Sequence, residues 1–575
     1  MITLGINAAF HDSAACLVRD GDVVAAAEEE RFTRLKHGKR PLPFSTWELP
    51  FHAIDYCLRA AGIGIAEVDR VAYSFDPYSL LGSRKADAKI ELPLEPSAHP
   101  VPEEWLAAWD PLFLSSIVNA PRHLKGGAPH HLRERFELRD AAAALEWTFV
   151  PHHLSHAASA FLPSPFVHAA VMTLDGRGER ATTSYGVGAG TRIDLLAHVS
   201  LPHSLGLLYE EVTSYLGFLR SSDEYKVMAL ASYGGTDLVR EFRNLVQTKE
   251  GGRYEVAPLD LERRFGPPRK RGAPLERRHF DVARALQEVL EERVLELASW
   301  LHRNAASENL CLAGGVALNC VLNARIRDHG PFRRVWVQPA AGDAGTALGA
   351  ALWVDAQERG EASYVMEHAY LGPEYGEDEI ESALRWAKVP HRRLRDVPAQ
   401  TAELLLDDKI VGWFQGRMEF GPRALGARSI LASPLHAEMQ ARLNEIKDRE
   451  DFRPVAPVVI EERAGEWFRG ASTSPFMLFV YDVLPESAKR IPAVTHVDGT
   501  ARIQTVRREQ NPLYYDLLRA FEARTGVPVL VNTSFNTRGM PIVCSPRDAL
   551  ESFWTTPLDA LVIGPFLVEK GAGAM

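Results

Sequence analysis

The chain has 575 residues, of which 46% are apolar and 24% are charged, and its formal net charge is -10. Because this length exceeds what one hydrophobic core usually serves, we expect two or more domains. No apolar run approaches the length of a membrane span and no charged-then-apolar leader opens the chain, which predicts a soluble, cytoplasmic protein with no membrane partner. The negative charge disfavours nucleic acid as the main partner.

The cysteines indicate a reducing compartment. They are scattered along the chain, and no two of them form a C-x-x-C pair. This pattern excludes a zinc ribbon and a disulfide framework. The five are Cys16, Cys57, Cys311, Cys320 and Cys544.

Two stretches of the first part of the chain have the same order of predicted elements. In each, three strand-like runs precede a helical run, and a hairpin turn is expected at the Asp-Gly and Gly-Asp pairs of residues 20–22. The pattern resembles the duplicated α/β architecture of actin, sugar kinases and acetate kinase, in which ATP lies between the halves. The expected strands are 2–7, 14–21, 22–30 and 68–75 in the first half and 168–176, 181–190 and 193–200 in the second; the expected helices are 45–62, from a serine start to a glycine stop, and 205–218.

Two glycine-rich loops follow a long amphipathic helix predicted over 279–305. Gly314 and Gly315 come where a strand is expected to give way to a helix, so their backbone N–H groups could approach a phosphate; a simple tight turn is the alternative. Residues 335–353 repeat this plan with Asp343 in the loop. No Walker-type phosphate loop is present, and the G-x-G-x-x-A match at 176–181 precedes a strand, which disfavours a dinucleotide fold.

A second unit is expected after a polar, glycine-containing stretch, which divides the chain into 1–364 and 365–575. In this unit, basic side chains lie beside glycine, proline and amide residues. Such loops favour phosphate binding, although a single arginine is more often solvated or paired. The basic residues are Arg423, Arg428, Lys447, Arg453 and Arg502.

Three histidines lie within five positions, at 152, 153 and 156. On a helix, either His152 or His153 could share a face with His156, and a packed helix start with a backbone-bonded histidine is the alternative. Asp175 and Asp343 are expected in cleft loops of the duplicated fold. Two imidazoles and two carboxylates would suit Fe, Mn, Zn or Mg, with open positions for phosphate oxygens or water.

Ten motifs, in order along nearly the whole chain, resemble the NodU/CmcH family of O-carbamoyltransferases. The resemblance implies an actin-like ATP domain, similar to the transferase that threonylcarbamoylates tRNA, followed by an α+β YrdC-like domain. The motifs are NAAFHDSAACL, AEEERFTRLKHG, HHLSHAASAF, TLDGRGE, SLGLLYEEVTSYLGF, LAGGVALN, GDAGTALGAAL, FGPRALGARSIL, KDREDFRPVAP and VNTSFNTRGMPIV.

By this resemblance, the second domain would make carbamoyl adenylate and pyrophosphate from carbamoyl phosphate and ATP, and the first would transfer the carbamoyl group to a hydroxyl and release AMP. The resemblance implies a divalent metal, commonly Fe(II), on His152, His156, Asp175 and Asp343, with His153 only a neighbour. It implies nucleotide contacts for Gly314, Gly315 and Asn319, and a carbamoyl phosphate pocket lined by Arg423, Lys447, Arg453, Arg502, Asn532 and Ser534.

A hydroxyl nucleophile needs a base, for which His11 is the candidate, and Lys36 is expected to aid the phosphate or acceptor side. Lys226 is kept where relatives often have a Gly-Lys pair, but Tyr225 replaces the glycine, which puts a backbone contact to nucleotide there in doubt.

The acceptor is left open. Loops over 76–114 are expected to shape its pocket, and a macrolide, aminoglycoside, ansamycin or sugar would fit antibiotic or other secondary metabolism. An actin-like kinase, a non-catalytic ATP-binding regulator and tRNA carbamoylation are the alternatives; hydrogenase-maturation carbamoyltransferases are disfavoured because their zinc-binding cysteine pairs are absent here. The oligomeric state is open, a homodimer included.

Overall fold

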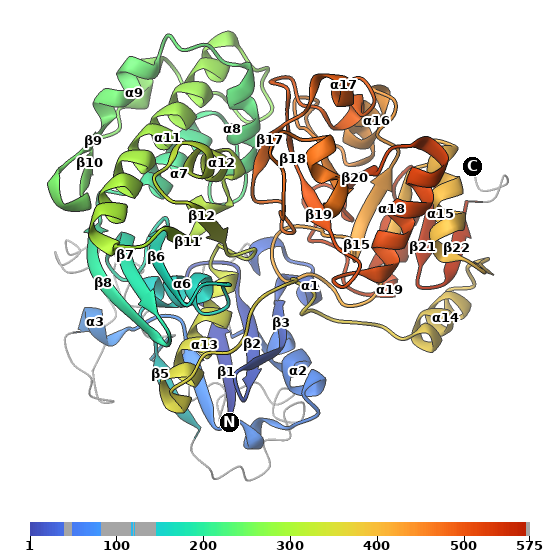
Figure 1. The fold of residues 1–575 in the computed structure, drawn as a ribbon, viewed down its shortest axis with the longest axis horizontal. Coiled ribbons are helices and arrows are strands. Elements are labelled where there is room, and N and C mark those ends of the chain that lie inside the picture. The colour runs from blue at the N-terminus through green and yellow to red at the C-terminus, as the bar shows by residue number, and fades with distance from the viewer. Residues whose placement is uncertain (39–48, 82–116, 119, 121–144, 571–575) are drawn as a thin grey trace, which may run out of the picture.

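The computed structural model describes residues 1–38, 49–81, 117, 118, 120 and 145–570 (Figure 1). Most of the predicted acceptor loops over 76–114 therefore lie outside the described residues. Among the helices of the described part, none is both long and apolar enough to cross a membrane. All five cysteines are free and buried.

The first half of the duplicated unit is a five-stranded sheet in the order β3-β2-β1-β4-β5. The first three strands pair antiparallel as a meander, and β4 and β5 then run parallel to β1. The elements are β1 (Ile2–Asn7), β2 (Ala14–Arg19), β3 (Asp22–Glu28), α1 (Glu30–Thr33), α2 (Phe51–Ala60), β4 (Arg70–Tyr73), α3 (Tyr78–Leu81) and β5 (Glu146–Phe149), with short 3₁₀ turns at Lys36–Gly38 and Ile65–Glu67.

The second half repeats this order as β8-β7-β6-β11-β12, with the same antiparallel meander and the same two parallel strands. The elements are α6 (His152–Phe161), β6 (His168–Leu174), β7 (Ala181–Ala189), β8 (Arg192–Ser200), α7 (Leu205–Tyr215), α8 (Glu224–Leu230), α9 (Val239–Leu245), β9 (Val246–Thr248), β10 (Tyr254–Val256), α10 (Leu261–Phe265), α11 (Arg277–Ala305), β11 (Asn309–Ala313), α12 (Cys320–His329), β12 (Arg334–Val337) and α13 (Ala344–Arg359).

The identical strand order of the two sheets confirms the duplicated α/β fold that the sequence predicts. The helix predicted over 45–62 is confirmed in part: α2 spans Phe51–Ala60, Leu49 and Pro50 are not helical, and residues 45–48 lie outside the described residues. Pro50 is the N-cap of α2 and explains why Leu49 is not helical, because a proline disfavours helical geometry at the residue before it.

Close packing of α6 against α13 brings the two halves together. A Cβ atom on Gly349 of α13 would lie 1.9 Å from the Ser155 carbonyl oxygen of α6, and one on Gly5 of β1 would lie 2.0 Å from the Ala347 carbonyl oxygen. Only glycine permits approaches this short. The small residues of 343–351 therefore set how near the N-terminus of α13 comes to the start of α6.

The second unit is α+β, as expected. Its eight-stranded mixed sheet has the order β13-β22-β21-β14-β15-β20-β16-β19, and helices including α15 and α18 pack beside it (Figure 1). The elements are α14 (Glu377–Trp386), β13 (Arg392–Arg393), α15 (Val397–Leu406), β14 (Val411–Phe414), β15 (Arg428–Ala432), α16 (Glu438–Ile446), β16 (Ala456–Ile460), β17 (Val480–Asp482), α17 (Pro485–Ala488), β18 (Thr500–Arg502), β19 (Gln504–Val506), α18 (Pro512–Thr525), β20 (Val529–Ser534), α19 (Pro546–Trp554), β21 (Ala560–Ile563) and β22 (Phe566–Glu569).

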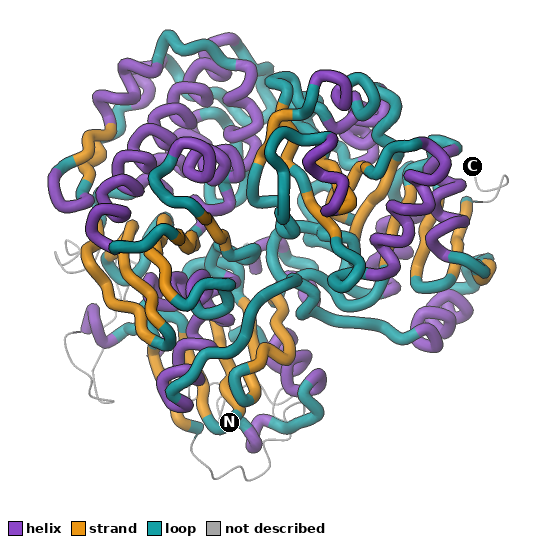
Figure 2. The backbone as a smooth tube through the Cα atoms, viewed as in Figure 1, coloured by secondary structure: helices purple, strands orange, loops and turns teal. Residues whose placement is uncertain are grey.

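This unit has its own hydrophobic core, which begins at Ile380. Met366, Ala369 and Leu371, by contrast, pack with the core of the duplicated unit. The domain boundary at 364/365 stays a prediction. Figure 2 shows that loops gather where the parts of the molecule meet.

A buried ion pair joins the two units at these loops. The guanidinium of Arg31 contacts Glu28 at 2.9 Å and donates to the Gly421 carbonyl at 2.9 Å, while Glu28 accepts the Gly421 N–H at 2.9 Å. Burial raises the pKa of Glu28, and Arg31 opposes that shift. The pair fixes α1 and the turn at Lys36–Gly38 against the second unit.

Removing one partner of this pair should leave a buried charge without compensation. We expect Arg31→Met to lower the free energy of unfolding by about 3–5 kcal/mol in urea unfolding followed by tryptophan fluorescence. Exposed Arg59, paired with Asp55, provides the control, and Arg59→Met should change the free energy of unfolding by less than about 0.5 kcal/mol. The double variant Glu28→Gln/Arg31→Met should lose less than Arg31→Met; an equal or larger loss would contradict this account.

Candidate active sites

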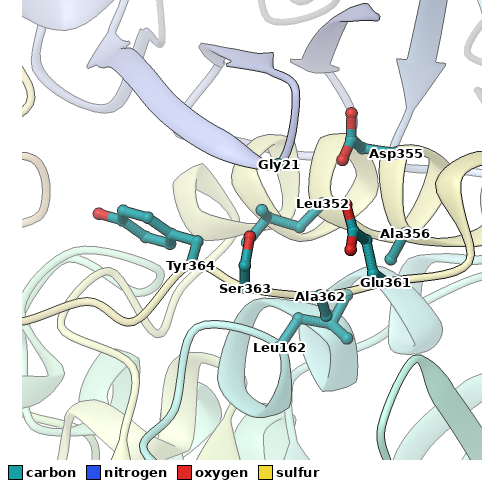
Figure 3. Close-up of a pocket in the computed structure, with 9 residues that line it drawn as sticks. All are labelled: Gly21, Leu162, Leu352, Asp355, Ala356, Glu361, Ala362, Ser363 and Tyr364. Atoms are coloured by element: carbon teal, nitrogen blue, oxygen red, sulfur yellow. The ribbon is translucent and has the colours of Figure 1, made fainter.

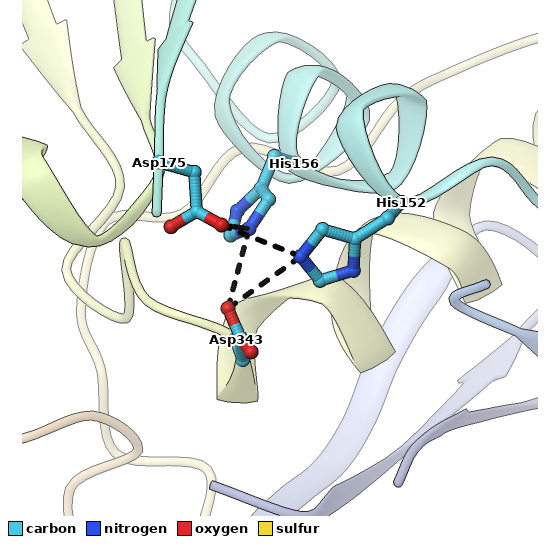
Figure 4. A group of neighbouring side chains, drawn as sticks. All are labelled: His152, His156, Asp175 and Asp343. Atoms are coloured by element: carbon cyan, nitrogen blue, oxygen red, sulfur yellow. Dashed lines mark ion pairs between the residues drawn. The ribbon is translucent and has the colours of Figure 1, made fainter. Parts of the chain in front are cut away.

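Four buried side chains converge where the two halves of the duplicated unit meet (Figure 4). His152 and His156 lie one turn apart on α6, Asp175 directly follows β6, and Asp343 directly precedes α13. Each residue offers one donor atom, and these four atoms all lie within 4.8 Å of one another.

The spacing suits a metal ion better than direct hydrogen bonding. Nε2 of His152 lies 3.6 Å from Asp175 Oδ2 and 3.5 Å from Asp343 Oδ1, and Nε2 of His156 lies 3.9 Å and 3.5 Å from the same atoms. Donors held at about 2.1 Å by one tetrahedral ion lie about 3.4 Å apart. Both Nε2 atoms are buried without a hydrogen-bond partner, so the residues fit a metal.

Neighbouring groups orient the donors. Nδ1 of His152 donates to the Ser74 carbonyl at 3.1 Å, which turns Nε2 toward the cluster as the atom that would bind an ion after losing its proton. Oδ1 of Asp175 accepts the Gly315 N–H at 2.8 Å, which leaves Oδ2 toward the histidines. Glu179 accepts the backbone N–H groups of His152 and Asp76, which fixes the start of α6.

The carboxylates and imidazoles of the cluster shift one another's pKa values. Burial disfavours a charged ring, but Asp343 and Asp175 raise the pKa of His152 well above its usual value. Burial would raise the pKa of Asp343, but His11 and His152 lower it to about 2. The carboxylates of the cluster are therefore ionised, as cation binding requires.

His153 points elsewhere: its Nδ1 lies 3.1 Å from the Ser184 hydroxyl, and burial lowers its pKa to about 3. Of the two histidine pairs open from the sequence, the structure brings His152 and His156 to the carboxylates.

His11 lies beside this cluster, with Nε2 at 3.8 Å from Asp343 Oδ2 and Nδ1 at 2.9 Å from Asp12 Oδ2. Its loop is held by Asn7 at the end of β1, whose side-chain N–H₂ group donates to the carbonyls of His11 and Asp12. Phe10 and Asp12 have φ values of 54° and 50°, so this loop is strained.

The glycine loop is more fully bonded within the protein than the sequence indicates. Gly314 donates to the Ala341 carbonyl and Gly315 to Asp175, and a single 3₁₀ turn (Gly315–Leu318) precedes α12. Both glycine N–H groups thus already donate within the protein. The glycines instead let the backbone pack closely and, because they lack side chains, leave space in the loop. Asn319 caps α12 and donates to Gln287. Nucleotide contacts of these residues remain predictions.

In the second unit, buried and partly buried cations outnumber the carboxylates described beside them, among which Glu450 pairs with Arg453 at 3.5 Å. Burial, with Arg502 nearby, lowers the pKa of Arg423 to about 9, and burial with Arg453 lowers that of Arg449 to about 9. Burial, then Arg449, Arg453 and Lys36, lower the pKa of Lys447 well below its usual value. Cations held this way are stabilised by an anion.

Lys447 is aimed by neutral oxygens: Nζ contacts the Ser534 carbonyl, the Ser534 hydroxyl at 3.0 Å and the Asn536 amide oxygen at 2.7 Å. Asn532 donates to Gln504, and its own amide oxygen is buried without a partner. Arg449 and Asn536 belong to this pocket but were missed from the sequence. The signal was present, because each lies two residues from a predicted pocket residue.

Tyr225 and Lys36 reach the same pocket from the first unit. The Tyr225 ring centroid lies 4.7 Å from Arg453 Cζ and 6.0 Å from Lys36 Nζ. Lys226 pairs with Glu450 at 3.0 Å. Arg423 of the second unit contacts the first unit, where it donates to the Leu318 carbonyl.

Arg428 corrects the sequence prediction of a phosphate-binding loop residue. It lies fully buried on β15, donates to the carbonyls of Gln415, Gly416, Ala427 and Pro373, and stacks on Phe414. Its guanidinium is used by backbone carbonyls, so it is a structural residue.

A separate small cavity lies at the opposite end of α13, between Gly21, Leu162, Asp355 and the loop at 361–364 (Figure 3). Its volume of about 10 Å³ can hold at most one water molecule. This cavity is too small for a substrate.

Metal binding should follow the four-residue geometry. We expect the wild type to bind one Co(II) per chain in a titration read by its visible absorption, and His156→Ala to weaken binding by at least 100-fold because a donor is lost. His153→Gln is the matched control from the same helix and should retain wild-type affinity. Equal binding by His156→Ala and wild type would contradict the assignment.

Anion binding should raise the pKa of Lys447, which is lowered in the free protein, so protons should be taken up. Sulfate does not titrate near pH 8 to 9, below the ordinary lysine pKa of about 10.4. Calorimetry in two buffers of different ionisation enthalpy should therefore show proton uptake on sulfate binding. Lys447→Met should reduce the uptake and exposed Lys489→Met should leave it unchanged, with Arg423 and Arg449, whose pKa values are also lowered, accounting for the remainder; release of protons would contradict the direction.

Comparisons with known proteins place this chain among described families. The family profile described as carbamoyltransferase N-terminus matches residues 2–89 and 129–352, and the profile described as carbamoyltransferase C-terminus matches 402–570. The chain is 42% identical to an uncharacterized protein of Synechocystis sp., over 99% of this chain and 97% of the relative. It is 40% identical to the nodulation protein NolNO of Sinorhizobium fredii, over 98% and 80% respectively.

It is also 35% identical to the 3'-hydroxymethylcephem-O-carbamoyltransferase of Amycolatopsis lactamdurans, over 62% of this chain and 66% of the relative. The two profiles together cover more than half of the chain. The chain therefore belongs to the carbamoyltransferase family, and it is a transferase enzyme.

Proposed function

We propose that this protein is an ATP-dependent O-carbamoyltransferase with one half-reaction in each unit. The observation that carries the proposal is the presence of two different sites in one chain: a buried cation pocket in the second unit and a His–Asp cluster in the duplicated unit. The first suits a phosphorylated donor, and the second suits transfer from an adenylate.

The second unit would form carbamoyl adenylate. Hydrolysis of carbamoyl phosphate gives carbamate and inorganic phosphate, and a carbamate oxygen then attacks the α-phosphorus of ATP and displaces pyrophosphate. The cations would hold the phosphate oxygens and offset their charge. The proposed lining is Arg423, Lys447, Arg449, Arg453, Arg502, Asn532, Ser534 and Asn536.

In the duplicated unit, His152, His156, Asp175 and Asp343 would hold a divalent metal, for which we propose Fe(II). When bound, such an ion stabilises negative charge on a departing phosphate and polarises the mixed anhydride. Gly314, Gly315 and Asn319 would border the nucleotide, and ATP use by this unit agrees with its duplicated fold.

His11 would accept the proton of the acceptor hydroxyl, because its ring lies beside Asp343 and is oriented by Asp12. Lys36 would offset the adenylate charge between the two sites, since it approaches the Tyr225 ring and lowers the pKa of Lys447. Lys226 is engaged by Glu450, so it would hold the units together at this point.

The acceptor would be a small hydroxylated molecule. One relative is named for carbamoyl transfer to a hydroxymethyl group of a cephem, and others are named nodulation proteins. A macrolide, aminoglycoside, ansamycin or sugar in antibiotic or other secondary metabolism would suit the same chemistry.

The products separate this function from its alternatives. Wild-type protein given ATP and carbamoyl phosphate should release pyrophosphate, and a panel of hydroxylated natural products should yield one with an added carbamoyl group by mass spectrometry. A kinase would yield ADP and a phosphorylated acceptor, and a regulator would yield neither. ADP, or no carbamoyl-phosphate-dependent pyrophosphate, would refute the proposal.

Variants should divide the half-reactions. Arg502→Met should reduce pyrophosphate formation by at least 100-fold because a cation of the donor pocket is lost. His11→Gln should leave pyrophosphate formation within twofold and lower transfer by about 10²–10⁴-fold, the range for loss of a general base. Loss of pyrophosphate formation in His11→Gln would show that the two sites are not independent.

A further inference from the structure

A second constellation of reactive side chains lies between the two proposed sites. The Ser222 hydroxyl lies 2.9 Å from His37 Nε2, and His37 Nδ1 lies 2.8 Å from Asp12 Oδ1. A nucleophile within reach of a base, with the base oriented by a carboxylate, is the arrangement of a nucleophilic triad.

The bond pattern assigns the roles. An aspartate carboxylate only accepts, so His37 donates from Nδ1 and presents the lone pair of Nε2 to the Ser222 hydroxyl. Burial disfavours the charged carboxylate, but His37 and His11 hold the pKa of Asp12 well below its usual range. Asp12 therefore stays ionised, as the orienting group of a triad must.

Asp12, His37 and Glu30 could also be taken for a metal site, because one donor atom from each lies within 4.8 Å of the others. Both ring nitrogens of His37 are already engaged, by Asp12 and Ser222. The Glu30 carboxylate accepts the backbone N–H of His37 and pairs with Arg31. The histidine ring thus has no nitrogen left for an ion.

Strained backbone marks two members of this group and the residue next to the third. The φ values are 50° at Asp12, 60° at His37 and 53° at Ser221, the neighbour of Ser222. Non-glycine residues adopt this region at a cost of about 1–3 kcal/mol each, and such strain concentrates at functional sites. The side chains of Asp12 and His37 remain 26% and 23% exposed, so a small reagent can reach them.

The position of Ser222 is equally specific. Three residues further along the chain, Tyr225 contacts Arg453 and Lys36 at the cation pocket. On the other side, Asp12 uses its second oxygen to contact His11, which lies beside Asp343. Ser222 therefore stands between the pocket that would make the adenylate and the cluster that would use it.

We propose that Ser222, His37 and Asp12 form a nucleophilic triad and that Ser222 takes up a carbamoyl group. The uptake rests on the proposed function. The Ser222 oxygen bonds to the carbonyl carbon of carbamoyl adenylate, the bond from that carbon to the phosphate oxygen breaks, and AMP leaves, while the serine proton passes to His37 Nε2. The acceptor hydroxyl oxygen then bonds to the carbamoyl carbon and its proton passes to His11, while the bond from that carbon to the Ser222 oxygen breaks and His37 returns its proton to that oxygen.

The triad is tested without any carbamoyl donor, by labelling the full-length protein with a fluorophosphonate probe. Trypsin releases residues 221–226, and fragmentation of that peptide distinguishes the two serines. We expect the probe on Ser222 in wild type and in the matched control Ser221→Ala. Labelling should be lost in Ser222→Ala and at least tenfold slower in both His37→Gln and Asp12→Asn.

Unlabelled Ser222, or labelling at the wild-type rate in both His37→Gln and Asp12→Asn, would overturn the triad. Thermal unfolding checks that each variant is folded, and Ser222→Ala removes only a partly buried hydroxyl, so it keeps the test decisive if the other two fail to fold.

Carbamoyl uptake is tested on the same peptide after incubation with ATP and carbamoyl phosphate but no acceptor. We expect one carbamoyl group on Ser222 only when ATP is present; cyanate formed from carbamoyl phosphate would modify residues without ATP. Pyrophosphate release with an unmodified Ser222 would overturn the uptake. If no pyrophosphate forms, the proposed function fails, and the probe result alone decides the triad.

Discussion

The carboxylate of Asp175 is the constraint on which the first site depends. One oxygen accepts the Gly315 N–H and so ties the end of β6 to the glycine loop after β11, and the other faces His152 and His156. Because the two oxygens are fixed relative to each other, the glycine loop and the metal donors keep one geometry. The close contact of α6 with α13 then adds Asp343 from the end of the other glycine-rich loop.

The second unit depends on the first through a few buried contacts. Glu28 and Arg31 hold Gly421 of the second unit, and Arg423, two residues later, donates to Leu318 of the glycine loop in the first unit. The same contacts position the turn at Lys36–Gly38 beside the cation pocket.

Much of the fold could be predicted from the sequence because its signals are local. Strand alternation and helical periodicity predict both halves of the duplicated unit, and the structure confirms their common strand order. In the described residues α2 begins directly after Pro50, because a proline disfavours helical geometry at the residue before it, and this signal outweighs the periodicity across 49–50. Arg428 was misassigned because its sequence neighbours resemble those of the pocket arginines, whereas only the sheet shows that its side chain is buried among carbonyls.

The sites, like the fold, combine local signals that the sequence shows with long-range contacts that it does not show. The His152–His156 spacing is a helical signal, but the choice between His152 and His153 depends on how α6 faces Asp175 and Asp343, which lie far away in sequence. Asp12 and His37 lie in two separate motifs and Ser222 lies in neither, and no spacing rule connects the three. Long-range convergence of this kind follows from the packed fold alone.

The convergence of four donors on one ion is the most direct point to measure. Crystals of the full-length protein grown with Co(II) should show a single anomalous peak at about 2.0–2.2 Å from Nε2 of His152, Nε2 of His156 and one oxygen each of Asp175 and Asp343. A peak elsewhere, or no peak at these four atoms under saturating Co(II), would contradict the account.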